Sequence, residues 1–292
     1  MTKPIKVLHV IYALSGGGAE RQLQLLLKYA PTNTVHGVLC VETRDVDLDS
    51  LGAEVFVYQR SGKFDFRLYL SCYKTIKNFQ PDIIHVWLPP VITIPAMLAA
   101  VLQNKPVIFS YRRRMYFYRF MSLVEYIVAL LSVKKVISNN SVSQSAQYYQ
   151  FLYNLKSGAT IPNGLDFSAI QLKTDHEVKT KKPINMLFVG RLVQEKNVLN
   201  LVRALACIPK NKRWILDIYG EGDLKPEALA LANQLGLTDH IIFHGFEKSI
   251  YSILAQSDVL LMPSNTEGMP NVLIEALATK IPVVASNISS IV

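Results

Sequence analysis

Glu267 and Glu275 are two carboxylates separated by seven residues, the first in a loop and the second on the helix that follows it. Pro270 suits the start of that helix, so the amides of Val272 and Leu273 would lie at its positive end and attract an anion. Two carboxylates beside an anion site suit a sugar nucleotide, because they can accept hydrogen bonds from sugar and ribose hydroxyls on either side of a diphosphate. Solvated charges at a helix end are the alternative interpretation.

Arg191 and Lys196 form a second candidate group. Arg191 follows a buried strand, and Lys196 lies five residues later, just before a predicted helix. Two cations at the carboxyl edge of a sheet would neutralise the diphosphate of a nucleotide sugar and the charge that develops as it departs. An arginine and a lysine that are merely solvated in a loop remain the alternative.

Gly17 and Gly18 belong to a run of three glycines between the first predicted strand and the first predicted helix. A backbone without side chains could approach a donor phosphate or an acceptor, with the positive end of the helix pointing at it. A simple tight turn explains the glycines equally well.

A basic and aromatic cluster occupies residues 112–119, with tyrosine and phenylalanine between its cations. Such a cluster suits an anionic membrane surface or an acceptor that bears phosphate. The same charges would attract nucleic acid, which we do not expect as a partner, and a solvated basic face is the simplest alternative. The cations are Arg112, Arg113, Arg114 and Arg119.

No metal site is expected. Asp45 and Asp47 spell D-x-D, but they lie in a polar loop between two early strands and are interpreted as solvated. Cys40, Cys72 and Cys207 are far apart and odd in number, which indicates ordinary buried thiols and neither a disulfide framework nor a zinc site.

The elements that must position these residues alternate between strands and helices. Continuously apolar strands that alternate with amphipathic helices predict parallel sheets covered on both faces. The pattern restarts after a polar segment, so we expect an α/β chain with two doubly wound, Rossmann-like domains facing a cleft, where ligands bind at the carboxyl ends of the strands. The predicted boundaries are residues 1–165 for the first domain, 166–183 for a linker and 184–292 for the second domain.

Charge distinguishes the two halves. The chain has a formal net charge of +9, and residues 1–163 carry 18 Lys and Arg against 9 Asp and Glu. The second half is therefore neutral, which suggests different partners for the two domains. Prolines break the longest apolar stretch, residues 83–102, so we expect a chain that is soluble or lies on a membrane surface.

Taken together, these motifs resemble a known family. Four motifs occur in the order found in glycosyltransferase family 4. They are the first glycine run, the Pro162–Asp166 junction, the Gly190-Arg191-Leu192 piece that leads to Glu195-Lys196, and the E-x7-E pair. The resemblance runs through the whole chain and is to the group 1, retaining enzymes of the GT-B fold.

The resemblance implies a metal-independent retaining hexosyltransferase of polysaccharide or lipopolysaccharide biosynthesis. It implies a donor sugar nucleotide, which we expect to be a UDP-sugar, in the second domain and a glycan or lipid-linked acceptor at the first. It also implies a cytoplasmic protein that lies peripherally on the inner face of the cytoplasmic membrane. The catalytic residues would be Arg191, Lys196, Glu267 and His85, and the donor-binding residues Gly17, Gly18, Arg191, Lys196, Glu267, Gly268, Met269, Val272, Leu273 and Glu275.

Other interpretations stay open at this stage. His85 is as well explained as a polar core residue as by contact with the transferred sugar, because the family more often has its histidine two positions later, where this chain has Trp87. A non-hydrolysing sugar-nucleotide epimerase is the alternative enzyme. A non-catalytic protein that binds anionic surfaces through its basic half is the alternative of another class. Because the resemblance implies further elements after Val292, we expect an incomplete second domain with impaired activity.

Overall fold

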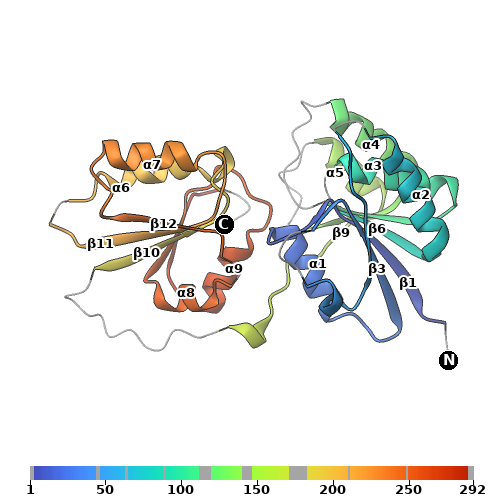
Figure 1. Ribbon diagram of the computed structural model, residues 1–292, viewed down its shortest axis with the longest axis horizontal. Coiled ribbons are helices and arrows are strands. Elements are labelled where there is room, and N and C mark those ends of the chain that lie inside the picture. Colours follow the sequence, from blue (N-terminus) through green and yellow to red (C-terminus); the bar gives the residue numbers. More distant parts are fainter. Residues whose placement is uncertain are drawn as a thin grey trace. The chain divides into compact units, whose positions relative to one another are not determined.

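The computed structural model describes residues 3–43, 47–62, 65–87, 90–111, 120–139, 147–170, 183–209, 211–247 and 249–288. The chain forms two compact units, Met1–Gly164 and Leu165–Val292, and each is considered by itself (Figure 1). The cluster Arg112–Arg119, the residue Asp45 and most of the predicted linker lie outside the described residues. In the part of the chain that the structure describes, no helix is long and apolar enough to cross a membrane.

The first unit is built on a seven-stranded sheet in the order β5-β3-β1-β6-β7-β8-β9, and all of its strand pairs are parallel. Its central strands are buried, as their apolar runs predict. The strands are β1 (Ile5–Val10), β3 (Thr34–Cys40), β5 (Glu54–Val57), β6 (Ile83–Trp87), β7 (Val107–Tyr111), β8 (Val133–Ser138) and β9 (Ala159–Thr160).

Helices cover both faces of this sheet. Leu23 and Leu27 of α1 (Gly18–Lys28) pack against one face. Four helices pack side by side over the other face and share its largest core (Figure 1). They are α2 (Arg67–Phe79), α3 (Pro90–Leu102), α4 (Phe120–Ser132) and α5 (Gln147–Leu155).

A side chain joins the beginning of the first unit to its end. Gln22, on α1, donates a hydrogen bond from Nε2 to the Gly164 carbonyl (2.9 Å) and accepts one from the Gly164 amide at Oε1 (2.7 Å). Gln22 is buried, so both polar ends of its amide are satisfied away from water. The contact fixes residue 164, where the unit ends.

The second unit has a five-stranded parallel sheet in the order β12-β11-β10-β13-β14. One hydrophobic core lies under α6 and α7, and another under α8 and α9. The elements are β10 (Ile184–Val189), α6 (Val198–Leu205), β11 (Trp214–Tyr219), α7 (Lys225–Gln234), β12 (Ile241–Gly245), α8 (Tyr251–Gln256), β13 (Val259–Met262), α9 (Asn271–Ala278) and β14 (Val283–Ala285).

Strand order creates a switch point in each sheet. In the first unit the chain moves outward from β1 to β3 and β5, then returns to the other side of β1 at β6. In the second unit it moves from β10 to β11 and β12 and returns at β13. Loops that leave two strands on either side of a switch point diverge, which leaves room for a ligand at the carboxyl edge.

The predicted fold class is confirmed, with small differences at element ends. Sequence periodicity missed β9 and the short pair β2 (Ala13–Leu14) and β4 (Glu42–Thr43), because two-residue strands are too short to show a repeat. The cysteines are free thiols, and burial raises the pKa of Cys40 to about 11 and of Cys72 to about 12. Cys207 is exposed, so its prediction as a buried thiol was wrong.

Three buried histidines form a row across the face of the first sheet that α1 covers. Neighbouring strands bring them together, with His36 on β3, His9 on β1 and His85 on β6. The rings of His9 and His36 stack with centroids 5.3 Å apart, and His9 Nε2 lies 3.0 Å from His36 Nδ1. His85 Nε2 lies 2.7 Å from the hydroxyl of Ser110 on β7.

The donors of the hydrogen bonds from His9 to Thr34 all point the same way along this row. The Thr34 hydroxyl donates to the Pro31 carbonyl, so its oxygen accepts from His36 Nε2, and His36 Nδ1 accepts from His9 Nε2. His9 Nδ1 is then a buried acceptor with no hydrogen-bond partner among the described residues. Burial lowers the pKa of His9 well below its ordinary value, with help from His85 and His36, and also lowers the pKa of His36.

We predict that the free energy of unfolding of the first unit falls as the pH drops below about 6.5. Below that pH, His9 and His36 bind protons in the unfolded chain but not in the folded one. The free energy of unfolding therefore has its full value above pH ~6.5 and decreases as the pH falls toward the lower pKa values of the folded state. Each histidine contributes up to about 1.4 kcal/mol per pH unit in that window.

Tryptophan fluorescence can test this prediction, because the chain has one tryptophan in each unit, Trp87 and Trp214. Urea unfolding of a Trp214→Phe protein between pH 7.5 and 5.5 follows Trp87 alone. His9→Gln keeps a donor for His36 but removes one titrating group, so the free energy of unfolding should change less with pH. An equal change with pH in the His9→Gln variant and its parent would contradict the role given to His9.

Candidate functional site

An ion pair joins the loops that leave β10 and β13, the two strands that flank the switch point of the second sheet. Lys196 Nζ lies 2.5 Å from Glu267 Oε1, and the Ser264 hydroxyl donates to the same oxygen at 2.7 Å. The two charged side chains are 19% and 10% exposed, so both remain within reach of a ligand. Two of the predicted site residues, 71 positions apart in the sequence, are thus in direct contact.

Further hydrogen bonds hold these two loops together. The Asn265 amide donates to the Glu195 carbonyl at 2.9 Å, and the Asn197 side chain donates to the Pro263 carbonyl at 3.1 Å. Asn197 has a left-handed backbone (φ 58°), which ends the short helical turn at Lys196 and begins α6. Asparagine tolerates this conformation better than most residues. The ion pair is therefore set by backbone geometry as well as by charge.

Arg191 extends from the same edge of the sheet. It comes two residues after the end of β10 and is exposed. Among the described residues it forms no ion pair, in contrast to Lys196. The site therefore offers one cation that is already paired with a carboxylate and another that is open to an anion from solution.

A third loop, Gly220–Gly222, packs against the first and was not predicted as part of the site. The Leu192 amide donates to the Glu221 carbonyl at 2.9 Å, and the Gly220 amide donates to Gly245, at the end of β12, at 2.6 Å. A Cβ on Gly220 or Gly222 would collide with the backbone of the loop that follows β10. Two glycines at alternate positions after a buried strand were the signal that could have revealed this loop.

Aromatic side chains lie where β11 and β12 end. Tyr219 stacks on His244 with ring centroids 4.4 Å apart, and His244 Nε2 lies 2.6 Å from Asp217 Oδ1. Phe246, just beyond β12, is 56% exposed. An exposed aromatic ring at the carboxyl edge of the sheet could stack on a planar group such as a nucleotide base.

The start of α9 differs in detail from the prediction. Pro270 is the residue before the helix, and the amide of Leu273 donates to its carbonyl at 3.2 Å, so that amide is not free to hold an anion. Val272 and Glu275 lie on the buried face of the helix, and Glu275 is only 1% exposed. A ribose diol would reach the Glu275 carboxylate only if neighbouring side chains moved. Gly268 and Met269 are half-buried in the preceding loop.

The first unit places its predicted site residues differently. Gly17 precedes α1 and Gly18 begins it, but the carboxylate of Glu20 folds back over Gly17 and occupies the space where a side chain would be. An anionic phosphate at this helix end would meet that negative charge. His85 is buried and hydrogen-bonded to Ser110, an arrangement that fits the alternative interpretation of a polar core residue.

Of the two aspartates in the D-x-D motif, the structure describes Asp47 alone. Asp47 Oδ1 accepts a hydrogen bond from the Asp49 amide, which is a local turn. No group of three His, Cys, Asp or Glu residues that could hold a metal ion occurs among the described residues.

We predict that Gly222→Ala lowers the free energy of unfolding of the second unit by about 1–3 kcal/mol, because the added methyl group forces the two loops apart. Trp214 fluorescence during urea unfolding measures the change. Gly62→Ala is the control, since a Cβ there meets nothing within 4 Å, and it should not destabilise the first unit. Equal stability of Gly222→Ala and the parent would show that the close packing of the loops is dispensable.

The solved structures with a similar fold include HepE and WaaG. Anabaena HepE, solved with UDP and glucose, aligns with a TM-score of 0.77 at 20% identity over 98% of this chain and 82% of its own. WaaG, described as a glycosyltransferase involved in lipopolysaccharide biosynthesis, aligns with a TM-score of 0.77 at 16% identity over 98% of this chain and 82% of its own. At these identities the comparison establishes the fold, which is of the GT-B type.

Sequence relatives include two enzymes named for lipid-linked substrates. The N-acetylgalactosamine-N,N'-diacetylbacillosaminyl-diphospho-undecaprenol 4-alpha-N-acetylgalactosaminyltransferase of Campylobacter jejuni is 32% identical over 58% of this chain and 46% of its own length. The UDP-Gal:alpha-D-GlcNAc-diphosphoundecaprenol alpha-1,3-galactosyltransferase of Escherichia coli is 26% identical over 77% of this chain and 62% of its own. The match therefore spans less than two thirds of either relative.

The two units match two family descriptions in succession. Residues 170–292 match "Glycosyl transferases group 1", and residues 16–169 match "Glycosyltransferase Family 4". Because the second of these matches alone covers more than half of the sequence, the chain belongs to glycosyltransferase family 4.

Proposed function

We propose that the protein is a retaining glycosyltransferase that moves a sugar from a nucleotide-sugar donor, a UDP-sugar, to a lipid-linked or surface-glycan acceptor. The observation that carries the proposal is the contact between Lys196 and Glu267 beside the exposed Arg191, at the switch point of the second sheet. A diphosphate is the anion that such a pair of cations suits. A structural neighbour, HepE, was solved with UDP and glucose and also with UDP-glucose, which supports the choice of base.

The acceptor side of the proposal draws on the relatives. The names of the C. jejuni and E. coli enzymes specify sugars on diphospho-undecaprenol, and a Staphylococcus aureus relative, 23% identical over 97% of this chain, is named for capsular polysaccharide biosynthesis. We extend the general class, a polyprenyl-linked or surface glycan, to this chain. Such an acceptor would hold the enzyme peripherally at the inner face of the cytoplasmic membrane.

In this proposal Arg191 and Lys196 bind the donor diphosphate. The acceptor hydroxyl attacks the anomeric carbon from the face that the leaving group departs from, the bond between that carbon and the diphosphate oxygen breaks, and the hydroxyl proton passes to the departing phosphate. Negative charge grows on the diphosphate as the bond breaks, so fixed cations lower the barrier. No carboxylate acts as a nucleophile and no metal is required.

The carboxylates have binding roles in this scheme. Lys196 exchanges Glu267 for the diphosphate when the donor arrives, which frees Glu267 to accept hydrogen bonds from the sugar hydroxyls. Ser264 continues to donate to Glu267 and holds it in place. Glu275 serves the ribose diol after the loop at residues 267–270 adjusts.

Lys196→Ala should lower kcat/KM by a factor of about 10² to 10³, which corresponds to about 2.7–4 kcal/mol of lost transition-state stabilisation. Release of nucleoside diphosphate in the presence of acceptor measures it. Lys212→Ala is the matched control, because Lys212 is exposed just before β11, at the opposite edge of the sheet from the site. A loss of less than threefold for Lys196→Ala would remove this residue from the site.

The same assay separates the competing functions. Acceptor-dependent release of UDP that persists in EDTA is the expected result, because cations of the protein replace a metal. Conversion of the sugar nucleotide to an epimer, without acceptor-dependent release, would identify an epimerase. Absence of any turnover alongside vesicle binding would favour the non-catalytic alternative, and a strict requirement for Mn²⁺ would contradict the metal-independent mechanism.

A further inference from the structure

The outer face of the four helices α2–α5 is unusually apolar for a surface. On α4, Leu123, Ile127 and Leu131 follow one another at intervals of one turn and are 41%, 48% and 80% exposed. On α3, which packs beside α4, Leu98 and Leu102 are also exposed, Leu102 by 75%. Exposed apolar side chains that gather over neighbouring helices mark a surface for another molecule, whereas scattered ones do not.

The charges on the same helices have one sign. α2 carries Arg67, Lys74 and Lys77 and no acidic residue. The one acidic residue in the sequences of α2–α5 is Glu125, which is completely buried and accepts a hydrogen bond from Thr93. No carboxylate from these four helices therefore reaches the outer surface.

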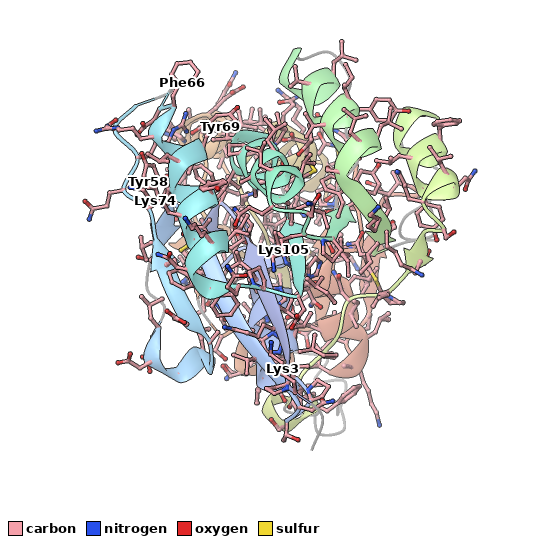
Figure 2. The ribbon with its side chains drawn as sticks, turned by 90° about the vertical axis from the view of Figure 1, so that its right-hand side faces the viewer. Lys3, Tyr58, Phe66, Tyr69, Lys74 and Lys105 are labelled. Atoms are coloured by element: carbon pink, nitrogen blue, oxygen red, sulfur yellow. The ribbon has the colours of Figure 1, made fainter. Side chains whose placement is uncertain are left out.

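Aromatic and basic side chains border the apolar face. Figure 2 shows Tyr69 and Lys74 on α2, Phe66 just before this helix, and Lys105 beyond the end of α3. Phe66 is 80% exposed. Its neighbour Asp65 is bound to Arg67, at 3.1 Å, and to Ser61, so this carboxylate is already neutralised at the border. Tyrosine, phenylalanine and lysine around an apolar surface are typical of the interface between lipid headgroups and acyl chains.

We propose that the outer face of α2–α5 is the surface through which the protein lies on an anionic phospholipid bilayer. Leu123, Ile127 and Leu131 enter the interface, and Lys74 and Lys77 meet lipid phosphates. A bilayer supplies an apolar layer and negative charge over a broad area, which is what this face complements. The inference deepens the proposed function, because it assigns peripheral attachment to a particular layer of the first unit. It rests on described residues alone and does not use residues 112–119.

Flotation with vesicles tests the proposal. The protein should bind vesicles of phosphatidylethanolamine and phosphatidylglycerol, and bind phosphatidylcholine vesicles at least tenfold more weakly. Ile127→Ser combined with Leu131→Ser should reduce the partition coefficient at least tenfold. Lys74→Ser combined with Lys77→Ser should reduce it by about fivefold per lysine, an effect that 0.5 M NaCl abolishes.

Matched controls come from the second unit, where Leu229 and Leu277 are also exposed. Serine at both positions removes similar apolar area and should change the partition coefficient less than twofold. Unfolding curves verify that each variant is folded. As a second measurement, Leu131→Trp should show a blue-shifted emission and quenching by brominated lipid on vesicle binding.

The outcomes separate this inference from the proposed function. Transfer to a water-soluble acceptor analogue, measured without vesicles, should be unchanged in all of these variants. Undiminished vesicle binding by the Ile127 and Leu131 variant, or equal binding to both lipid mixtures, would overturn the membrane surface while leaving the activity intact. A dimer that forms without lipid and is lost in this variant would show that a second copy of the chain covers the face. Vesicle binding without any transfer would overturn the function alone.

Discussion

The contact between Lys196 and Glu267 depends on the parallel pairing of β10 and β13. Each strand ends at the same edge of the sheet, and the chain diverges from that edge because β11 and β12 lie to one side. A lysine and a carboxylate distant in sequence are then brought to 2.5 Å, and the hydrogen bonds of Asn197 and Asn265 hold their loops. Without a ligand the pair neutralises itself in a half-buried position, which avoids leaving a buried charge alone. With an anionic ligand the same lysine can change partners.

The two units place their polar groups differently. In the second unit they gather at the carboxyl edge, where Ser264 donates to the ion pair and Arg191 follows β10. In the first unit the buried imidazoles of His9 and His36 cross the middle of the sheet, and much of the positive charge is carried by α2 and, in the sequence, by residues 112–119. This division agrees with the unequal charge of the halves, neutral for the unit with the ion pair and basic for the other.

Much of the fold and part of the site could be predicted from sequence. Apolar runs and helical periodicity located the long elements, and E-x7-E with Gly190-Arg191-Leu192 identified the two loops that meet. Contacts between loops could not be foreseen. The backbone packing of Gly220, the capping of α9 by Pro270 and the carboxylate of Glu20 over Gly17 each depend on how segments meet in three dimensions, which the spacing of residue types does not specify. The histidine row was missed because it requires the strand order β3-β1-β6.

The pair of hydrogen bonds between Gln22 and Gly164 has a consequence for synthesis. The side chain of Gln22, on α1, is hydrogen-bonded to the backbone of a residue that is made 142 positions later. Until residue 164 has left the ribosome, a buried side-chain amide on α1 lacks its partners, and the first unit cannot reach its final packing. The first unit can then reach its final packing while the second is still being made, so synthesis favours folding of the first unit before the second.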